Sequence, residues 1–479
     1  MDVLTLLLGF ALVWGLGIVL LAAIATRDAN TSGAGDLAWT AGCGWFVGAF
    51  LLTLWMRLLA QIHVPFSIAS IGLPLLVATG LLASRARTLK TFRWNGAFTP
   101  LMGGNLIGWQ RAIWLIVLGW LAVRFALLFT EIVWRPLYPW DAWTQWGTKA
   151  RVWFELRTMA PFVAASEWLQ ATGPNVYFDA APHYPGTVPL LQVWSAILLG
   201  RWEDTLVNLP WWLTGVAFAF AIYGYLAREG FEPLMALVGT WLVLSLPILE
   251  VHIALAGYAD LAMSTYLTLA ALCSLRWVRT RGWGDATIAA LLLAACVVIK
   301  NPGKVWVATL VPGLVIAMLP RQGIRIATGL FLVAICTTLV LASAEPVILG
   351  YRLHLDFEMP WRALFDAYFA FGNWHLLWYG AIAVAVLARR HLLSRELAPY
   401  TAIVAAGLMF LLFGFAFTNA RVWVEDQSTV NRATLHLAPL IIVWMLLAFR
   451  AWARDLTLRP APIPIFQLSD SKNANSARR

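Results

Sequence analysis

Charged side chains are scarce in this chain, and their scarcity is the first constraint on its structure. Asp, Glu, Lys and Arg make up 12% of the 479 residues, whereas hydrophobic side chains make up 61%. A soluble globular domain carries about 25% charged residues. The composition therefore excludes a soluble domain and predicts a polytopic membrane protein. The net charge of +10 does not indicate nucleic-acid binding, because in membrane proteins the distribution of Lys and Arg among the loops carries the information.

Cysteine is also rare. The four cysteines, Cys43, Cys273, Cys296 and Cys336, lie in or beside apolar runs without metal-ligand spacing, which predicts packing residues. No basic segment precedes the first apolar run, 3–25, and this run is long enough to cross a bilayer. We therefore expect it to be a transmembrane helix and not a cleavable signal peptide. No internal repeat is visible, which disfavours transporter folds built from two related halves.

What the sequence has in place of charge is a series of long apolar runs. Their lengths predict about 13 transmembrane helices. The runs are 3–25, 42–60, 64–84, 112–131, 206–227, 233–249, 261–277, 285–300, 304–319, 325–344, 374–388, 398–418 and 434–450. A further run, 188–200, has about 13 residues and is too short to cross unaided. It predicts a re-entrant or interfacial helix.

The basic residues predict the orientation. The segment 85–111 contains five of them, and short loops rich in Lys and Arg face the cytoplasm. The long loop 132–187 then faces the outside of an inner (plasma) membrane. If 188–200 does not cross, the later basic loops and the C-terminus are all cytoplasmic. We divide the chain into 1–111, with N-terminal helices and a basic loop, 112–450, with the outer loop 132–187, and a partly disordered tail, 451–479.

The stretch 131–189 stands out because it mixes acids, bases, tryptophans and prolines. Between residues 140 and 156, Trp143, Trp146, Ala150, Trp153 and Phe154 recur at helical spacing. This pattern predicts an amphipathic helix that lies in the membrane interface with its tryptophans at headgroup depth.

Asp141 stands at the first turn of this helix. Its position is equally typical of a helix cap, because a carboxylate is favoured at a helix N-terminus.

Several later polar residues stand where outer segments meet apolar runs. Asp260 precedes the run that begins at residue 261, a position typical both of a functional acid and of an N-cap. Lys300 begins the sequence Lys-Asn-Pro-Gly between two apolar runs. The segment 351–358 alternates polar and apolar residues, which predicts an extended piece that acts as a lid or as a solvated connector. Glu425, Asp426 and Gln427 form an acidic patch for which surface pairing is the default explanation.

Four motifs occur in a particular order along the chain. They are Asp141 followed by an aromatic helix and His183-Tyr184-Pro185-Gly186-Thr187-Val188-Pro189, then Gly257-Tyr258-Ala259-Asp260, then Lys300-Asn301-Pro302-Gly303, and finally the segment from Asn431 through Arg432 and His436 to Pro439. This order resembles the membrane glycosyltransferases of the GT-C class, in particular the bacterial branch of the aminoarabinose transferase of lipid A and the protein O-mannosyltransferases. The resemblance covers residues 112 to 450.

The resemblance implies an all-α GT-C-like fold and transfer of a sugar from a polyprenyl-phosphate donor. The acceptor is an unidentified glycan, lipid or protein on the outer face. Asp141 is the expected general base and Asp260 a second acid. A phosphate leaving group gains charge in the transition state, so cations aimed at it lower the barrier. The residues expected to bind substrate are Lys149, His183, Tyr184, Lys300, Arg432 and His436.

Each of three cations also has a simpler interpretation. His183 is typical of a loop histidine, Lys300 of a lysine snorkelling to the interface, and Arg432 of an arginine that binds headgroups.

The sequence departs from the stricter family pattern at one place. Some members have paired acids in the first loop, whereas Asp141 is flanked by Trp140 and Ala142. We therefore predict an enzyme without a metal or other cofactor, although Asp141 and Asp260 could share a divalent ion if folded together.

Two other functions stay open. A transporter or lipid flippase would use charges inside the membrane as a substrate path, but charges within the apolar runs are few. An O-antigen ligase or polymerase would carry its major outer loop late in the chain, whereas the longest one here follows the fourth run.

Overall fold

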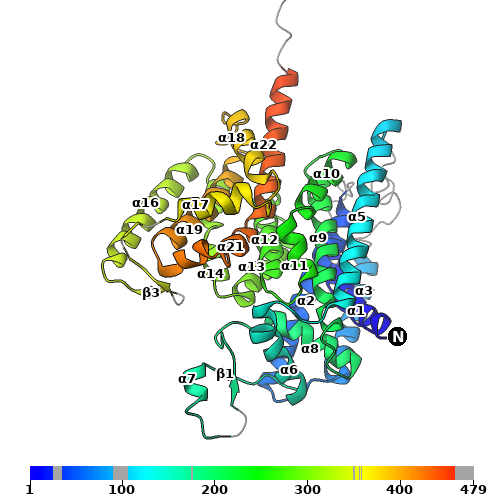
Figure 1. Cartoon of the computed structure of the whole chain (residues 1–479). Helices are drawn as coiled ribbons and strands as arrows, with labels where there is room; N and C mark the ends of the chain where they lie inside the picture. The colour runs from blue at the N-terminus through cyan, green and yellow to red at the C-terminus, as the bar shows by residue number, and fades with distance from the viewer. Residues whose placement is uncertain are drawn as a thin grey trace, which may run out of the picture.

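The protein is an all-α bundle with several long helices (Figure 1). The computed structural model describes residues 1–24, 35–89, 106–173, 176–348, 351–354, 356, 357 and 359–458. About three quarters of the structure is helical. The described part contains only two small sheets, in which β1 (Phe162–Val163) pairs with β2 (Tyr177–Phe178), and β3 (Val347–Ile348) pairs with β4 (Tyr351–Arg352). The predicted all-α, polytopic class is confirmed.

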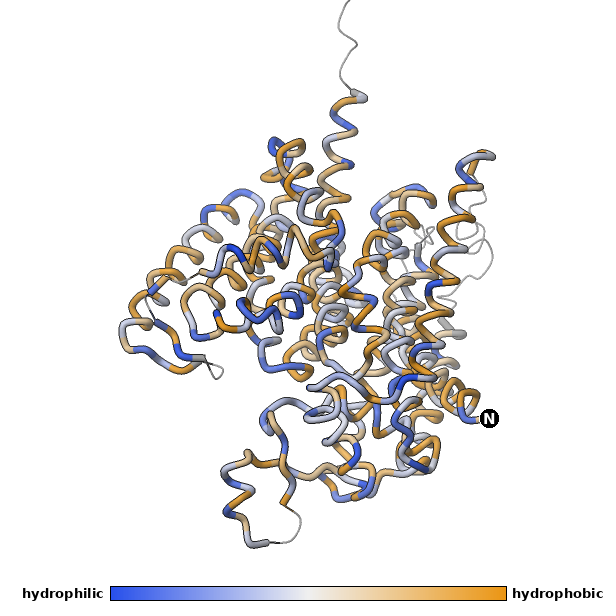
Figure 2. The backbone as a smooth tube through the Cα atoms, viewed as in Figure 1, coloured by the Kyte–Doolittle hydropathy of each residue, from blue (hydrophilic) through white to orange (hydrophobic). Residues whose placement is uncertain are grey.

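Eight helical segments of the described residues are long and apolar enough to cross a membrane. They span Asp2–Ile24, Asp36–Gln61, Ile68–Ala86, Gly108–Trp134, Leu206–Arg228, Asp260–Thr280, Gly323–Ala342 and Ala398–Ala416. A ninth forms if α10 (Pro233–Leu244) and α11 (Pro247–Ala254), which are bent by 67° at their junction, count as one span. Figure 2 shows hydrophobic residues along most of the length of these helices. All of the predicted apolar runs fall on helices, but several of those helices are short, so the count of about 13 stays a prediction.

The N-terminal helices pack as one group. It comprises α1 (Asp2–Ile24), α2 (Asp36–Gln61), α3 (Leu73–Leu89) with the preceding π-turn η1 (Ile68–Gly72), α5 (Gly108–Trp134), α9 (Leu209–Arg228) and α10. Glycines allow the closest approaches, since a Cβ on Gly17 would collide with the backbone of Gly44, and one on Gly42 with that of Ala221. Small residues at crossings are how apolar helices associate where lipid removes the hydrophobic driving force.

The C-terminal half forms a second group beside the first (Figure 1). Its long or paired helices are α12 (Asp260–Thr280), α13 (Trp283–Ile299), α14 (Gly303–Ala308), α15 (Val311–Met318), α16 (Gly323–Ala342), α18 (Leu377–Leu387), α19 (Ala398–Ala416) and α22 (Ala438–Leu458). Short elements connect them, namely α17 (Trp361–Phe365), η4 (Asp366–Ala370), η5 (Asn419–Arg421), α20 (Val422–Glu425) and α21 (Val430–Leu435). Helix α22 runs past the predicted end at residue 450 and reaches Leu458, while the rest of the predicted tail lies outside the described residues.

Part of the segment 351–358 is extended, as its alternation predicts. Beyond β4, Leu353 forms an isolated bridge with Thr418, and the His354 backbone N–H donates to the Phe417 carbonyl oxygen over 3.0 Å. Residues 355 and 358 lie outside the described residues. These contacts attach the segment to the end of α19.

Many of the basic residues gather at one end of the bundle. Arg279 pairs with the Glu229 carboxylate, Arg450 donates to the Glu229 carbonyl, and Arg228 pairs with Asp36. Arg279 and Arg228 stand in the last turns of α12 and α9, Asp36 begins α2, and Arg450 lies in the second half of α22. Which side of the membrane the basic loops and the long mixed loops face stays a prediction.

Helix α8 (Thr187–Leu199), which follows the long loop, does not cross the bundle. Thr187 at its start bonds Arg57 near the end of α2, and Arg201 just after it pairs with Asp2 at the start of α1. The end of α2 and the start of α1 lie at the same end of the bundle, because the two helices are antiparallel neighbours. The prediction that 188–200 does not cross is consistent with this geometry.

The predicted helix over 140–156 is divided and its apolar face is shifted. It consists of a π-helical turn, η2 (Ala142–Trp146), followed by α6 (Gly147–Leu156). Trp146, Ala150, Trp153 and Phe154 are buried within the protein, whereas Trp143 is 48% exposed. In the π-turn Ala142 takes a buried position beside them. That the tryptophans lie at headgroup depth stays a prediction. The loop also contains the short helix α7 (Ala165–Trp168), and the turn η3 (Leu206–Asn208) precedes α9.

Cysteine labelling tests this topology. In a Cys336→Ala background, which removes the one exposed native thiol, single cysteines replace Glu155, Arg201 and Arg390. We expect a membrane-impermeant maleimide to label positions 155 and 201 from the outer face and position 390 only after lysis, because short basic loops face the cytoplasm. Opposite labelling of 155 and 201 would show that α8 crosses the membrane.

Candidate active site

A buried carboxylate holds together three segments that are far apart in the sequence. Asp260, the first residue of α12, is 0% exposed. Its Oδ1 accepts hydrogen bonds from Lys300 Nζ at 2.6 Å and from His436 Nε2 at 2.9 Å. Its Oδ2 accepts from Arg432 Nε at 3.0 Å and Arg432 Nη2 at 2.8 Å. Both oxygens are therefore saturated by cationic or polar donors.

The local chain explains why Lys300 reaches Asp260. Helix α13 ends at Ile299, and Lys300 is extended, with φ of −149° and ψ of 145°. Pro302 disfavours the helical conformation for the residue before it, so the helix breaks here. Gly303 then lies so close to the Cys296 carbonyl that any Cβ would collide with it. The break places Lys300 at the level of the α12 N-terminus.

Arg432 connects this cluster to the long loop. Its Nη2 lies 2.6 Å from Asp141 Oδ2 as well as 2.8 Å from Asp260 Oδ2. The guanidinium also lies over the Tyr258 ring, 4.2 Å from its centroid, a cation–π geometry. Asp141 makes no side-chain capping hydrogen bond. The contact with Arg432 is therefore what fixes its carboxylate.

The loop between α11 and α12 fits against the helix of Asp141 because of a glycine. Gly257 has φ of +108°, in the region that favours glycine, and a Cβ there would collide with Ala142. Trp211 Nε1 donates to the Tyr258 carbonyl oxygen at 2.8 Å and so holds the same loop from α9. Gly257 and Tyr258 thus bring the two carboxylates to either side of one guanidinium.

The two carboxylates differ in solvent access. The Asp260 side chain is 0% exposed, whereas that of Asp141 is 23% exposed. Asp141 Oδ2 faces Arg432, and among the described residues no contact is found for Oδ1. Burial disfavours the charged form of Arg432, but Asp260 and then Asp141 outweigh it and raise the pKa of Arg432. The guanidinium therefore stays charged, and Asp141 is the more solvent-accessible of its two carboxylate partners.

His436 forms the inner wall of the cluster. Its ring packs edge-on against Trp306 with centroids 5.7 Å apart. Nε2 faces Asp260, while Nδ1 is buried and has no hydrogen-bond partner among the described residues. The ring therefore orients Asp260 from the side away from solvent.

Lys149 lies in a different buried pair. Its Nζ is 3.0 Å from Asp179 Oδ2 and donates to the carbonyl oxygens of Ala181 at 2.7 Å and Tyr184 at 3.3 Å. Two of the three ammonium donors are therefore used on backbone carbonyls of the loop, and the charge is paired with the Asp179 carboxylate. Burial lowers the pKa of Lys149, and the Asp179 charge opposes this shift. Lys149 thus connects α6 to the segment 179–184 and fixes the position of that segment.

Tyr184 and His183 follow the same loop. The Tyr184 ring packs edge-on against Trp146 at 5.3 Å between centroids, and the His183 side chain is exposed. Among the described residues, no hydrogen bond or ion pair joins His183 to Asp141 or Asp260. Their role in substrate binding stays a prediction.

Glu250 and His252 on α11 have separate environments. Glu250 pairs with Arg124 of α5, with Arg124 Nε 2.7 Å from Oε1. His252 is buried, its ring lies 5.5 Å from that of Tyr258, and its Nε2 has no partner in the described part of the chain. Only His252 therefore adjoins the cluster.

No group of three or more His, Cys, Asp or Glu side chains that could hold a metal is found among the described residues. Between Asp141 and Asp260, the position that a shared divalent ion would occupy is filled by the Arg432 guanidinium. The prediction of a metal-independent site stays a prediction.

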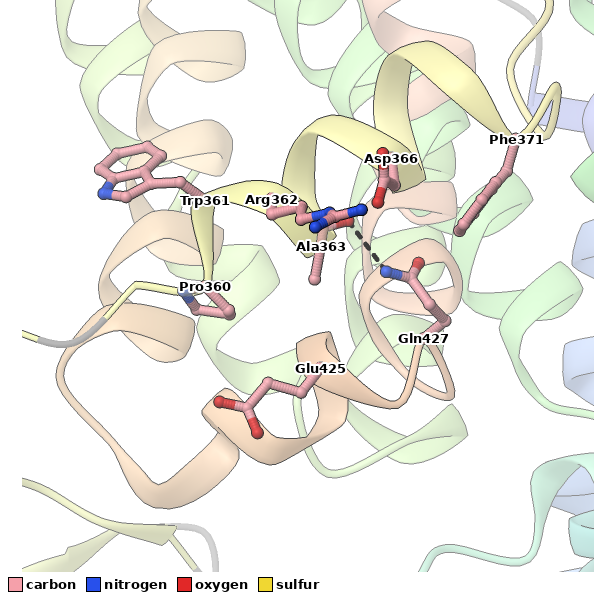
Figure 3. A pocket seen from close by; sticks show the side chains of 8 residues that line it. All are labelled: Pro360, Trp361, Arg362, Ala363, Asp366, Phe371, Glu425 and Gln427. Atoms are coloured by element: carbon pink, nitrogen blue, oxygen red, sulfur yellow. Dashed lines mark hydrogen bonds between the residues drawn. The ribbon is translucent and has the colours of Figure 1, made fainter.

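An open cleft of about 490 Å³ lies between α17 with η4 and the end of α20 (Figure 3). Its lining is Pro360, Trp361, Arg362, Ala363, Asp366, Phe371, Glu425 and Gln427. Gln427 Nε2 closes one side by donating to the Ala363 carbonyl oxygen at 2.9 Å. Two of the lining residues, Glu425 and Gln427, belong to the acidic patch that the sequence showed, for which surface pairing, for example with Arg432, was the default explanation. Arg432 instead faces Asp260 and Asp141.

The sequence reasoning also missed Arg57. It lies inside the predicted apolar run 42–60, and its one positive charge there is the signal that could have found it. Its contacts are described below.

Three comparisons with known proteins found no relative of this chain. No protein-family model matches the chain, and neither curated proteins nor solved structures show a significant similarity to it. The fold and composition define the class as an all-α membrane protein.

Removing the charge of each carboxylate should affect stability very differently. Asp260→Asn leaves Lys300 and Arg432 without their buried counter-charge, and we expect a loss of about 3–5 kcal/mol. Asp141→Asn breaks a partly exposed pair and should cost about 1 kcal/mol or less. Thermal unfolding of the purified proteins in one detergent measures both. Equal melting temperatures for the two variants would contradict the central role given to Asp260.

Proposed function

We propose that this protein is a membrane glycosyltransferase that moves a sugar from a polyprenyl-phosphate donor to a hydroxyl-bearing acceptor at the outer membrane boundary. The observation that carries the proposal is the Asp141–Arg432–Asp260–Lys300 cluster. It places one accessible carboxylate beside two cations that a second, buried carboxylate fixes in position. The order of the motifs that contain these residues, which resembles the GT-C class, supports the same function.

Asp141 supplies the base in this mechanism. A hydroxyl is a weak nucleophile, and a carboxylate within hydrogen-bond reach takes its proton as the oxygen attacks the anomeric carbon. The bond between the anomeric carbon and the phosphate oxygen breaks, and its electron pair leaves with the lipid phosphate. The free Oδ1 of Asp141 is the atom suited to accept the proton.

Arg432 and Lys300 stabilise the leaving phosphate. A guanidinium has five N–H donors, and Nε and Nη2 of Arg432 are the atoms that face the two carboxylates. The two donors on Nη1 therefore remain for a ligand. Lys300 Nζ uses one donor on Asp260 and has two others. Cationic donors fixed in advance lower the barrier because they need no reorganisation as charge develops.

Asp260 is a positioning residue in this proposal. It is saturated and fully buried, so it does not act as a base. Its two negative oxygens hold Arg432 and Lys300 at fixed positions and balance part of their charge. The cleft between α17 with η4 and the end of α20 offers carboxylates, an amide and aromatic faces, a composition suited to a hydroxyl-rich acceptor.

A transporter or flippase is the second candidate, and one contact favours it. Arg124 on α5 and Glu250 on α11 form an ion pair within helices that meet the requirements for a span. Ionisable pairs inside a membrane commonly line substrate paths. Transport does not require Asp141 to exchange a proton with a hydroxyl, so the two functions separate by experiment.

Asp141→Asn should reduce sugar transfer by a factor of about 10² or more, because the amide cannot accept the proton. Membranes containing the protein are supplied with tritium-labelled polyprenyl-phosphate hexoses and pentoses, and label is followed into the envelope fraction and into released lipid phosphate. Asp141→Glu should retain part of the activity. Glu155→Gln, which removes an exposed carboxylate from the same loop, is the matched control.

Two results would overturn the proposal. Normal transfer by Asp141→Asn would remove the assigned base. Absence of transfer by the wild type, together with lipid flipping that survives Asp141→Asn, would establish the transporter. Mass analysis of envelope glycans in a deletion strain identifies the sugar and the acceptor.

A further inference from the structure

Arg57 is a cation in an apolar span. Asp36 and Arg57 are the only charged residues in the sequence of α2, and Asp36 is paired with Arg228 at the opposite end of the helix. Arg57 lies one turn before the end of α2 at Gln61, with Trp55, Met56, Leu58 and Leu59 around it in the sequence. A charged side chain at this depth is costly unless it has a partner.

The partner of Arg57 within the protein is a neutral hydroxyl. Its Nη2 donates to Thr187 Oγ1 at 3.1 Å. Its Nε is buried and has no hydrogen-bond partner, and none of the ion pairs found in the described residues involves Arg57. The Arg57 side chain is partly exposed, its Nε is buried, and it faces no counter-charge among the described residues. Arg124, Arg228 and Arg432, by contrast, each face a carboxylate.

The surroundings of Arg57 fix its direction. Thr187 is the first residue of α8, and its hydroxyl donates to the Val298 carbonyl oxygen at 2.5 Å. The hydroxyl proton is thus committed to α13, so the oxygen lone pair is what faces Arg57. Val298 lies two residues before Lys300 on the same chain segment. Arg57 therefore lies where α2, α8 and α13 meet. This is the end of the bundle at which α13 ends and Lys300 follows it.

We propose that Arg57 and Thr187 form a binding site for the phosphate ester of a lipid. The missing counter-charge is an anion, and the position near the end of an apolar helix places that anion at the boundary of the bilayer. A planar guanidinium binds phosphate oxygens through two parallel hydrogen bonds. The shared chemistry is a phosphate ester on an apolar tail, which a polyprenyl phosphate and a phospholipid headgroup both provide. The site does not depend on the sugar-transfer reaction.

The simpler interpretation is that Arg57 only ties α8 to α2 through Thr187. The two interpretations differ in what the ligand-free protein gains from the charge. A structural tie stabilises the protein without ligand. A ligand site leaves an uncompensated buried charge, whose replacement by an apolar side chain of similar length is neutral or stabilising.

Binding to the delipidated full-length protein in detergent tests the proposal. The probes are a polyprenyl monophosphate, phosphatidic acid and inorganic phosphate, and the readouts are the dissociation constant and the ligand-induced rise in melting temperature. We expect Arg57→Met to weaken binding of the polyprenyl monophosphate at least 10-fold and to leave the ligand-free melting temperature unchanged or higher. Arg57→Lys should retain part of the affinity. Arg111→Met, which removes an exposed arginine at the start of α5, is the matched control and should bind as the wild type does.

Each outcome decides a point. Equal Arg57-dependent binding of phosphatidic acid assigns the site to lipid phosphates in general, whereas preference for the polyprenyl compound assigns it to the carrier lipid. Equal binding of inorganic phosphate would remove the lipid from the proposal and overturn it. Unchanged affinity in Arg57→Met, or a lower ligand-free melting temperature with the ligand shift intact, would establish the structural tie. Arg57-dependent binding without any sugar transfer would retain this site and reject the proposed function.

Discussion

The structure depends on one buried carboxylate that cannot be left without partners. Asp260 has no solvent access, and its two oxygens accept hydrogen bonds from Lys300, His436 and Arg432. An isolated carboxylate in such surroundings would be very unfavourable, so the segments of Lys300 and of Arg432 and His436 must both meet the N-terminus of α12 for it to remain charged. The same contacts place the cations and, through Arg432, orient Asp141. Stability and the candidate chemistry therefore depend on the same group.

The two acids show how burial assigns different roles to one residue type. Asp260 is saturated and inaccessible, which suits a carboxylate that holds others in position. Asp141 is partly exposed and uses one oxygen on Arg432, which leaves the other for a reacting proton. Sequence position alone gave both residues the same two interpretations, a helix cap or a functional acid. The contacts with Arg432, and not the helix termini, distinguish them.

The sequence predicted the helical class and the residues around Asp260 well. It predicted the contacts within the loop 132–187 less well. Asp141, Asp260, Lys300, Arg432 and His436 stand at junctions between apolar and polar segments, where an ionisable group is conspicuous, and the structure brings all five together. Lys149 looked similar, but Asp179, which is distant in sequence and unremarkable in pattern, takes up its charge. The π-turn at the start of the loop helix was not predicted, because such a turn leaves no signal in hydrophobic spacing. Arg57 was missed because a single charge does not interrupt an apolar run.

The two cationic positions, at Lys300 with Arg432 and at Arg57, differ in how their charge is balanced, and this difference has a physical consequence. Lys300 and Arg432 bear two positive charges against the two negative charges of Asp141 and Asp260, so the cluster is close to neutral before any ligand binds. Such a cluster gains little from binding an anion. In the proposed reaction, a proton on Asp141 would make the net charge of the cluster positive at the moment when the phosphate leaves. Arg57 has no carboxylate among the described residues and attracts an anion at all times. In the functions proposed above, Arg57 binds a lipid phosphate in the ground state, while Arg432 and Lys300 act on a phosphate in the transition state. Interactions made only in the transition state are the ones that raise the rate.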